Sequence, residues 1–412
     1  MSPDFMLHPK DYSFGTFFCI IPDQAVPLLK NLLMNNGYSN DFLELRALYN
    51  HELNEVRISN SETRIVNLLF RSDFGKESFS NMEDAGISEN MTFRYPVFVP
   101  ASKESRKVII LLHGLNERSW IKYLTWGHWL SEKTGSYVIL FPISFHVNRS
   151  PGSWIDPRTT TGILNERRDR FKNVEMSSFA NITLSNRLTS QPMRFFSSGY
   201  QTASDIMKLL SQIRDGQHEL IPGGSTVDIF AYSIGAFLGQ ILLIGNPDGL
   251  LSDSRLFMFC GGSVFSNMYG TSKLIMDSFA YQRVYGFFMN DLEKEIRKES
   301  PLSDFLRSSQ LGLAFRSMID FEGFRAFREN ILQKLKEQIR SVTLVKDSVI
   351  PAGGILRTLG TLVRKNRKTV EVCDFPYPYT HENPFPLLNN PLREEVDRCF
   401  RQLFTEASLF LA

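Results

Sequence analysis

The sequence predicts an α/β fold, built on a mostly parallel sheet that helices flank on both faces. Two short runs are almost wholly apolar, KVIILL at residues 107–112 and YVILF at residues 137–141, as strands covered on both faces should be. Stretches with apolar residues at helical spacing lie between these runs and later ones of the same kind. Strands that alternate with helices along a chain pair in parallel between two helical layers.

Residues 1–88 are expected to form an N-terminal accessory segment that carries no chemistry. Residues 27–34 and 41–49 have the composition of helices and are separated by a turn-forming Asn-Asn-Gly, while residues 65–70 read as a strand. Residues 92–99 then alternate apolar and polar side chains, and Pro96 indicates an edge strand.

The remaining elements follow in order from residue 107. A helix is predicted over about residues 117–132, between the two apolar runs, and another over residues 200–213. Residues 144–196 show no clear periodicity, which indicates an excursion over a site. Further strands are predicted over residues 226–230, 256–260, 342–345 and 369–373, with two helical stretches within 264–340 and a closing helix that Pro391 opens.

One stretch carries a chemical signature, TVDIFAYSIGAFLGQILLIG at residues 226–245. A buried strand feeds a helix through Ala231-Tyr232-Ser233-Ile234-Gly235, a turn that would push the Ser233 hydroxyl out of the sheet. Residues two positions from the serine must be small, since strand and helix backbones pass close together there. The stretch resembles the nucleophile elbow of the α/β-hydrolase superfamily, although Ala231 stands where glycine is commoner.

The resemblance implies that an acid and then a histidine follow the serine in the chain. The chain has seven histidines, and only His381 follows Ser233, in the loop after the last predicted strand. Asp347 ends the VTLV strand and is the expected acid, with Asp374 at the end of the last strand as its rival. Ser233 would attack, His381 would accept its proton, and Asp347 would orient His381.

The same resemblance implies an oxyanion hole made of two backbone N–H groups. One is expected from Ile234, and the other from Leu115, which follows a His113-Gly114 pair similar to the HG motif of the superfamily. His113 is expected to hold its turn by hydrogen bonds. Asn116 and Glu117 are expected either to reach the substrate or to cap the loop.

The resemblance covers about residues 92–405 and places the α/β-hydrolase core at residues 89–263 and 341–412. Residues 264–340 stand where many members of the superfamily carry a helical cap, and the chain resembles a bacterial-type branch with such a cap. The aromatic side chains of this segment are expected either to line an acyl pocket or to form the core of the cap; they are Tyr269, Phe279, Tyr281, Tyr285, Phe287 and Phe288.

The amino-acid composition limits the classes of binding partner that the chain is expected to have. The 46 Lys and Arg against 44 Asp and Glu give no electrostatic case for nucleic acid or an anionic membrane. None of the four cysteines, Cys19, Cys260, Cys373 and Cys399, lies at metal-ligand spacing, and buried free thiols fit a reducing compartment. The N-terminal residues show no signal-peptide pattern and no apolar run is long enough for a membrane span, so a cytoplasmic protein is expected.

The sequence therefore predicts a serine hydrolase that cleaves a carboxylic ester or related acyl compound through an acyl-enzyme. No metal or organic cofactor is implied, and the expected partner is a small-molecule acyl substrate. Two alternatives stay open: a thioesterase or peptidase with the same triad, and a catalytically silent member of the fold that binds a ligand. The sequence indicates neither the substrate nor the oligomeric state.

Overall fold

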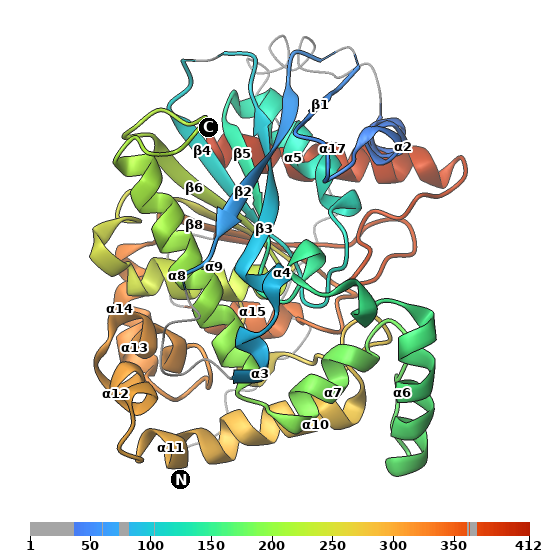
Figure 1. The fold of residues 1–412 in the computed structure, drawn as a ribbon. Helices are drawn as coiled ribbons and strands as arrows, with labels where there is room; N and C mark the ends of the chain where they lie inside the picture. The colour runs from blue at the N-terminus through green and yellow to red at the C-terminus, as the bar shows by residue number, and fades with distance from the viewer. Residues whose placement is uncertain (1–36, 60, 74–81, 103, 361, 363–368) are drawn as a thin grey trace. The chain divides into compact units, whose positions relative to one another are not determined.

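A computed structural model of the 412-residue chain describes residues 37–59, 61–73, 82–102, 104–360, 362 and 369–412. The helix predicted over residues 27–34 and the side chain of Cys19 lie outside the described residues. The described part of the chain is organised around one nine-stranded sheet (Figure 1).

The strands follow one another across the sheet in the order β1-β2-β3-β5-β4-β6-β7-β8-β9. The three pairs among β1, β2, β3 and β5 are antiparallel, and the five pairs from β5 to β9 are parallel. The predicted fold class, a mostly parallel sheet flanked by helices, is confirmed. The strands are β1 (Glu55–Arg57), β2 (Arg64–Arg71), β3 (Thr92–Val99), β4 (Lys107–Leu112), β5 (Tyr137–Phe141), β6 (Thr226–Tyr232), β7 (Leu256–Phe259), β8 (Ile339–Leu344) and β9 (Val370–Cys373).

Alternate side chains of the central strands face two helical layers. On one face lie α2 (Tyr38–Leu48), α5 (Ile121–Thr134) and α17 (Leu392–Leu411), which contact one another. The Phe230 ring of β6 stacks there on Phe404 of α17, with centroids 5.3 Å apart, and meets Trp126 of α5 at 6.0 Å. The neighbouring Ile229 and Ala231 belong to the apolar core of the other face, with α8 (Arg194–Arg214) and α9 (Ile234–Gly245) (Figure 1).

The register of the parallel strands brings two predicted site segments to one edge of the sheet. Leu112 at the end of β4 pairs with Ala231 near the end of β6. The turn that starts at His113 and the turn that holds Ser233 therefore follow adjacent strand ends, where ligands of parallel α/β sheets bind.

The prediction that Pro96 marks an edge strand is wrong. β3 lies between β2 and β5, and residues 55–71, from the predicted accessory segment, contribute β1 and β2 to the same sheet. β5 pairs only with Val97 and Phe98 of β3, so Pro96 has no ladder partner on that side and its missing N–H costs nothing there.

Residues 144–196 contain helices that the sequence analysis did not predict, α6 (Pro157–Arg170) and α7 (Ile182–Ser190). Helix α6 starts at Pro157, and the Asp156 side chain accepts a hydrogen bond from Arg158 N–H. Only Thr160, Leu164 and Arg167 of this helix are buried, so it has no apolar stripe to give a periodic signal.

The segment between β7 and β8 is helical as predicted, but it is divided into more pieces. Ser300 and Ser309 cap two of them, accepting hydrogen bonds from the N–H groups of Ser303 and Gly312. The pieces are α10 (Ser278–Gly286), a π-helical turn (Phe287–Asp291), α11 (Leu292–Ile296), α12 (Pro301–Ser308), α13 (Gln310–Ser317) and α14 (Arg325–Lys334). Three further short helices are α3 (Met82–Ala85), α4 (Ser88–Met91) and α15 (Ala352–Thr358).

Candidate active site

Ser233 occupies a strained turn between β6 and α9. Its φ of 58° and ψ of −122° are unusual for a residue with a side chain. The turn requires Gly235, because a Cβ there would lie 2.6 Å from the Leu112 carbonyl oxygen and 2.8 Å from that of His113. The predicted strand, turn and helix around Ser233 are all present.

The structure brings His381 and Asp347 to Ser233 from loops after the last two strands. His381 Nε2 lies 2.6 Å from Ser233 Oγ, and His381 Nδ1 lies 2.7 Å from Asp347 Oδ2. Since the carboxylate can only accept, Nδ1 carries the hydrogen, and Nε2 is left to accept from the serine hydroxyl. All three side chains are buried.

The Asp347 carboxylate is fixed by its own loop. Its Oδ1 accepts hydrogen bonds from the N–H groups of Val349 and Ile350, at 2.9 and 2.8 Å, which leaves Oδ2 for His381. Burial and the nearby Asp347 charge raise the pKa of the Cys260 thiol, which directly follows β7, well above its usual range.

The rival carboxylate, Asp374, lies elsewhere. Its Oδ1 accepts from the Tyr379 hydroxyl at 2.9 Å and lies 2.9 Å from Lys346 Nζ, in a solvent-exposed position. The structure therefore joins Asp347, and not Asp374, to His381.

The loop of His381 is held by residues that the sequence analysis did not single out. The Tyr232 hydroxyl donates to the His381 carbonyl oxygen, and the two rings stack with centroids 5.6 Å apart. Lys122 Nζ donates to the Glu382 carbonyl oxygen at 3.0 Å and lies 4.7 Å from the centre of the Tyr232 ring. Tyr232 was visible as the residue before the serine, whereas no local pattern marks Lys122.

The turn after β4 faces the same edge and is fixed by His113. Its Nδ1–H donates to the Gly114 carbonyl oxygen at 2.8 Å, and its Nε2 accepts from the N–H of Ile143 at 2.9 Å. Burial lowers the pKa of His113 to about 3, so the ring is neutral. The predicted structural role of His113 is confirmed. Within the described part of the chain, no hydrogen bond engages the N–H of Leu115 or of Ile234.

Asn116 and Glu117 tie the turn to its surroundings. Asn116 Nδ2 donates to the carbonyl oxygens of Ala180 and Leu274, both at 2.7 Å, and so joins the 144–196 excursion to the 264–340 segment. Glu117 accepts from the Tyr123 hydroxyl at 2.8 Å and pairs with Lys122.

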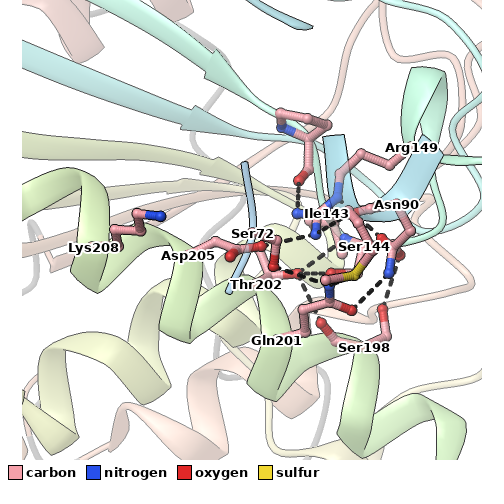
Figure 2. A network of polar contacts seen from close by, with 12 residues as sticks. Ser72, Asn90, Ile143, Ser144, Arg149, Ser198, Gln201, Thr202, Asp205 and Lys208 are labelled. Carbon is pink, nitrogen blue, oxygen red and sulfur yellow. Dashed lines mark hydrogen bonds and ion pairs between the residues drawn. The ribbon is translucent and has the colours of Figure 1, made fainter. Parts of the chain in front are cut away.

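A buried polar network holds the loop at Ile143 and Ser144, which is hydrogen-bonded to this turn (Figure 2). Arg149 pairs with Asp205 of α8 at 2.8 Å, and its other N–H groups donate to Asn90 and to the Pro142 carbonyl oxygen. The N–H of Ser144 donates to the Thr202 hydroxyl at 3.0 Å. The network thus fixes the loop that contains Ile143, whose N–H holds His113.

Comparison with known proteins assigns the chain to a family. The model described as "Family of unknown function (DUF6051)" matches residues 53–412. The chain belongs to this family. No protein with a curated description matches the sequence.

Similarity to solved structures is distant. A cold-adapted esterase from an Arctic intertidal metagenomic library matches at 11% identity and a TM-score of 0.39, over 84% of this chain and 94% of that one. A carboxyl esterase from Bacillus coagulans matches at 11% identity and a TM-score of 0.40, over 84% and 99%. The peroxisomal alpha-beta-hydrolase Lpx1 from Saccharomyces cerevisiae matches at 12% identity and a TM-score of 0.38, over 84% and 90%. Likenesses this distant indicate no substrate.

Two cavities of this DUF6051 chain lie beside the turn that holds Ser233. The larger cavity encloses about 1170 Å³, its open mouth included, and the smaller one about 450 Å³ measured in the same way. Leu115, Ile234 and Phe195 border both, and Ser233 borders the smaller one. The predicted excursion at residues 144–196 does lie over a cavity, because it contributes side chains from Phe145 to Phe196 to the wall of the larger one.

The aromatic side chains of residues 264–340 are divided between the two expected roles. Tyr281 lines the smaller cavity. Phe288 is buried against Phe265 and Phe315, Phe279 stacks on Phe171 at 4.1 Å, and Tyr269 is exposed. Tyr285 and Phe287 also pack against the core, so four of the six pack within the protein, and only Tyr281 of this set lines either of the two cavities.

Among the described residues, no group of three or more His, Cys, Asp or Glu side chains is placed to hold a metal ion. The described helices include none that is both long and apolar enough to cross a membrane. Cys260, Cys373 and Cys399 are buried free thiols.

Proposed function

We propose that the chain is a serine hydrolase of the α/β-hydrolase superfamily that cleaves a carboxylic ester through an acyl-enzyme. One observation carries the proposal: the continuous hydrogen-bonded chain from Ser233 Oγ through His381 to Asp347, at 2.6 and 2.7 Å. A serine hydroxyl becomes an effective nucleophile only when a base takes its proton, and the base needs an orienting acid.

In the proposed reaction, Ser233 Oγ attacks the acyl carbon while its proton passes to His381 Nε2. The imidazolium that forms is stabilised by Asp347 and then gives its proton to the leaving oxygen. A water molecule, deprotonated by His381, releases the acyl group and restores Ser233.

Leu115 and Ile234 supply the two N–H donors for the oxyanion in this proposal. Both residues flank the nucleophile, and neither N–H has a protein acceptor among the described residues. Donors that are fixed before the reaction stabilise the developing charge without reorganising. The helices of residues 264–340 act as a cap over this site, while residues 89–263 and 341–412 form the core together with β1 and β2. The buried thiols support the further proposal of a reducing, cytoplasmic compartment.

Covalent labelling tests the proposal directly. The purified protein should react with a fluorophosphonate probe, and Ser233→Ala should not. A set of matched ester, thioester and amide substrates then identifies the bond that is cleaved. A protein that is folded but neither labelled nor active on any of the three would be a ligand-binding member of the fold, and the proposal would be wrong.

A further inference from the structure

The two cavities lie on chemically different sides of Ser233. Val349 and Ile350 border the smaller cavity, and their N–H groups hold the Asp347 carboxylate that orients His381. The smaller cavity is therefore on the side of the acid and base. The larger cavity is bordered by Leu115 and Ile234, but by no described residue of the Asp347 or His381 loops.

This difference between the two cavities indicates which half of an ester each cavity would hold. His381 has to protonate the leaving oxygen, so the leaving group must lie on the side of the acid and base. The acyl group, which stays on Ser233 in the acyl-enzyme, then points into the other cavity. The larger space is thus available to the acyl chain, and the smaller one to the alcohol.

The far part of the larger cavity is apolar. It lies between α8 and α9 and is closed by α12 and α13, whose side chains come from the 264–340 segment. Its lining there includes Phe196, Leu238, Ile241, Phe305, Leu311 and Phe315.

The charged side chains of the cavity wall are already engaged within the protein. Arg187 and Arg194 both pair with Asp84, at 3.0 Å each. Arg118 donates to the Ala180 carbonyl oxygen, and Glu117 accepts from Tyr123. A ligand that carried its own charge into this cavity would have to compete with these pairs, so the cavity suits an uncharged chain.

We infer that the substrate is an ester of a long, uncharged, apolar acyl group, which occupies the larger cavity, with a small alcohol in the smaller one. The inference rests on the proposed function and adds the substrate class to it. Each methylene that leaves water on binding contributes about 0.8 kcal/mol, or roughly fourfold in kcat/KM when it is also bound in the transition state.

Two series of esters test the inference. Nitrophenyl esters from acetyl through butyryl to octanoyl should show a rising kcat/KM, by about two-hundredfold between butyryl and octanoyl if all four added methylenes are buried. Acetate esters of lengthening alcohols should show no comparable rise. A flat acyl series, or a rise in the alcohol series instead, would overturn the assignment of the cavities.

Replacing Gly199 with a larger residue would shorten the larger cavity. Gly199 lies in α8 on the cavity wall, and a Cβ added there would meet no atom within 4 Å. Gly199→Leu and Gly199→Phe should lower kcat/KM for the octanoyl ester at least tenfold more than for the acetyl ester. The matched control is Gly162→Phe, in the exposed helix α6, where an added Cβ also meets no atom within 4 Å.

The outcomes separate this inference from the proposed function. Absence of fluorophosphonate labelling in the parent protein would reject both. Labelling and acetyl hydrolysis with no dependence on acyl length would reject the inference alone. Equal loss of acetyl and octanoyl hydrolysis in both Gly199 variants, with labelling retained, would also reject it, because a shortened cavity should spare the acetyl ester.

Discussion

Tyr232 and His381 are joined by a hydrogen bond that runs from the tyrosine hydroxyl to the histidine backbone carbonyl, and their rings stack at 5.6 Å. The residue before the candidate nucleophile thus holds the candidate base. This contact connects the end of β6 to the loop after β9, two segments that are 149 residues apart in the chain.

Tyr232→Phe should slow turnover without changing substrate affinity. The ring stays in place, but the buried His381 carbonyl loses its donor, which costs about 1–3 kcal/mol. We expect kcat to fall roughly tenfold or more while KM stays within a few-fold. Tyr49→Phe is the matched control, since its hydroxyl donates to Asn67 of β2 and contacts no residue of the Ser233, Asp347 or His381 segments. Equal effects of the two substitutions would show that the Tyr232 hydroxyl does not position His381.

Asp347→Asn should be far more damaging than Asp374→Asn. In the first variant an amide N–H₂ would face His381 Nδ1, which favours the tautomer in which Nε2 carries the hydrogen and cannot accept from Ser233. A loss on the order of ten-thousandfold in kcat is expected on a small activated ester, against less than a few-fold for Asp374→Asn. The reverse order would transfer the acid role to Asp374.

Local sequence was sufficient for the parts of the site that depend on local geometry. The strand, strained turn and helix around Ser233 follow from small residues at fixed spacing, and His381 followed from being the only histidine after the serine. The parallel strands could be predicted as well, because KVIILL and YVILF have to be buried on both faces.

Long-range contacts could not be predicted in this way. Lys122 reaches Glu382 across 260 residues, and Arg149 reaches Asp205 across 56. The helical periodicity around Lys122 and Asp205 predicts the helices but not the partners of these polar side chains. The prediction of an edge strand at Pro96 was wrong because strand pairing is also a long-range contact. The strand of Pro96 is internal, but Pro96 itself is not paired with β5. Helix α6 was missed because it is exposed on most sides and therefore lacks an apolar stripe.

His146→Gln should weaken the acid sensitivity of stability. Burial, and then the nearby His113, lower the pKa of His146 from 6.5 to about 3. Between these values the unfolded chain binds a proton that the folded protein excludes, so the free energy of unfolding falls as the pH falls. Between about pH 6 and pH 4, the free energy of unfolding of the parent protein should fall by about 1.4 kcal/mol more per pH unit than that of the variant. Urea denaturation at several pH values measures both slopes, and parallel slopes would contradict the prediction.

Gly235→Ala should prevent the turn from forming as it does in the parent. The added Cβ would lie 2.6 and 2.8 Å from two backbone oxygens of β4 and its turn, which cannot rotate away as a side chain can. We expect a loss of stability of at least about 1–3 kcal/mol and a large loss of fluorophosphonate labelling. Thermal unfolding and the labelling rate measure the two effects. Gly162→Ala, where the added Cβ meets no atom, should change neither.

Arg149→Met should destabilise the protein because the buried Asp205 carboxylate would lose its ion-pair partner. Arg149 is fully buried, and its partner Asp205 is buried in the same polar network, so removing the guanidinium leaves a buried carboxylate without its ion-pair partner (Figure 2). Breaking one partner of such a pair costs about 3–5 kcal/mol. The double variant Arg149→Met with Asp205→Leu should recover part of that loss, because it removes the stranded charge as well. Urea denaturation at neutral pH compares the parent, the two single variants and the double variant. If the two single losses simply add in the double variant, the ion pair is not what holds this network together.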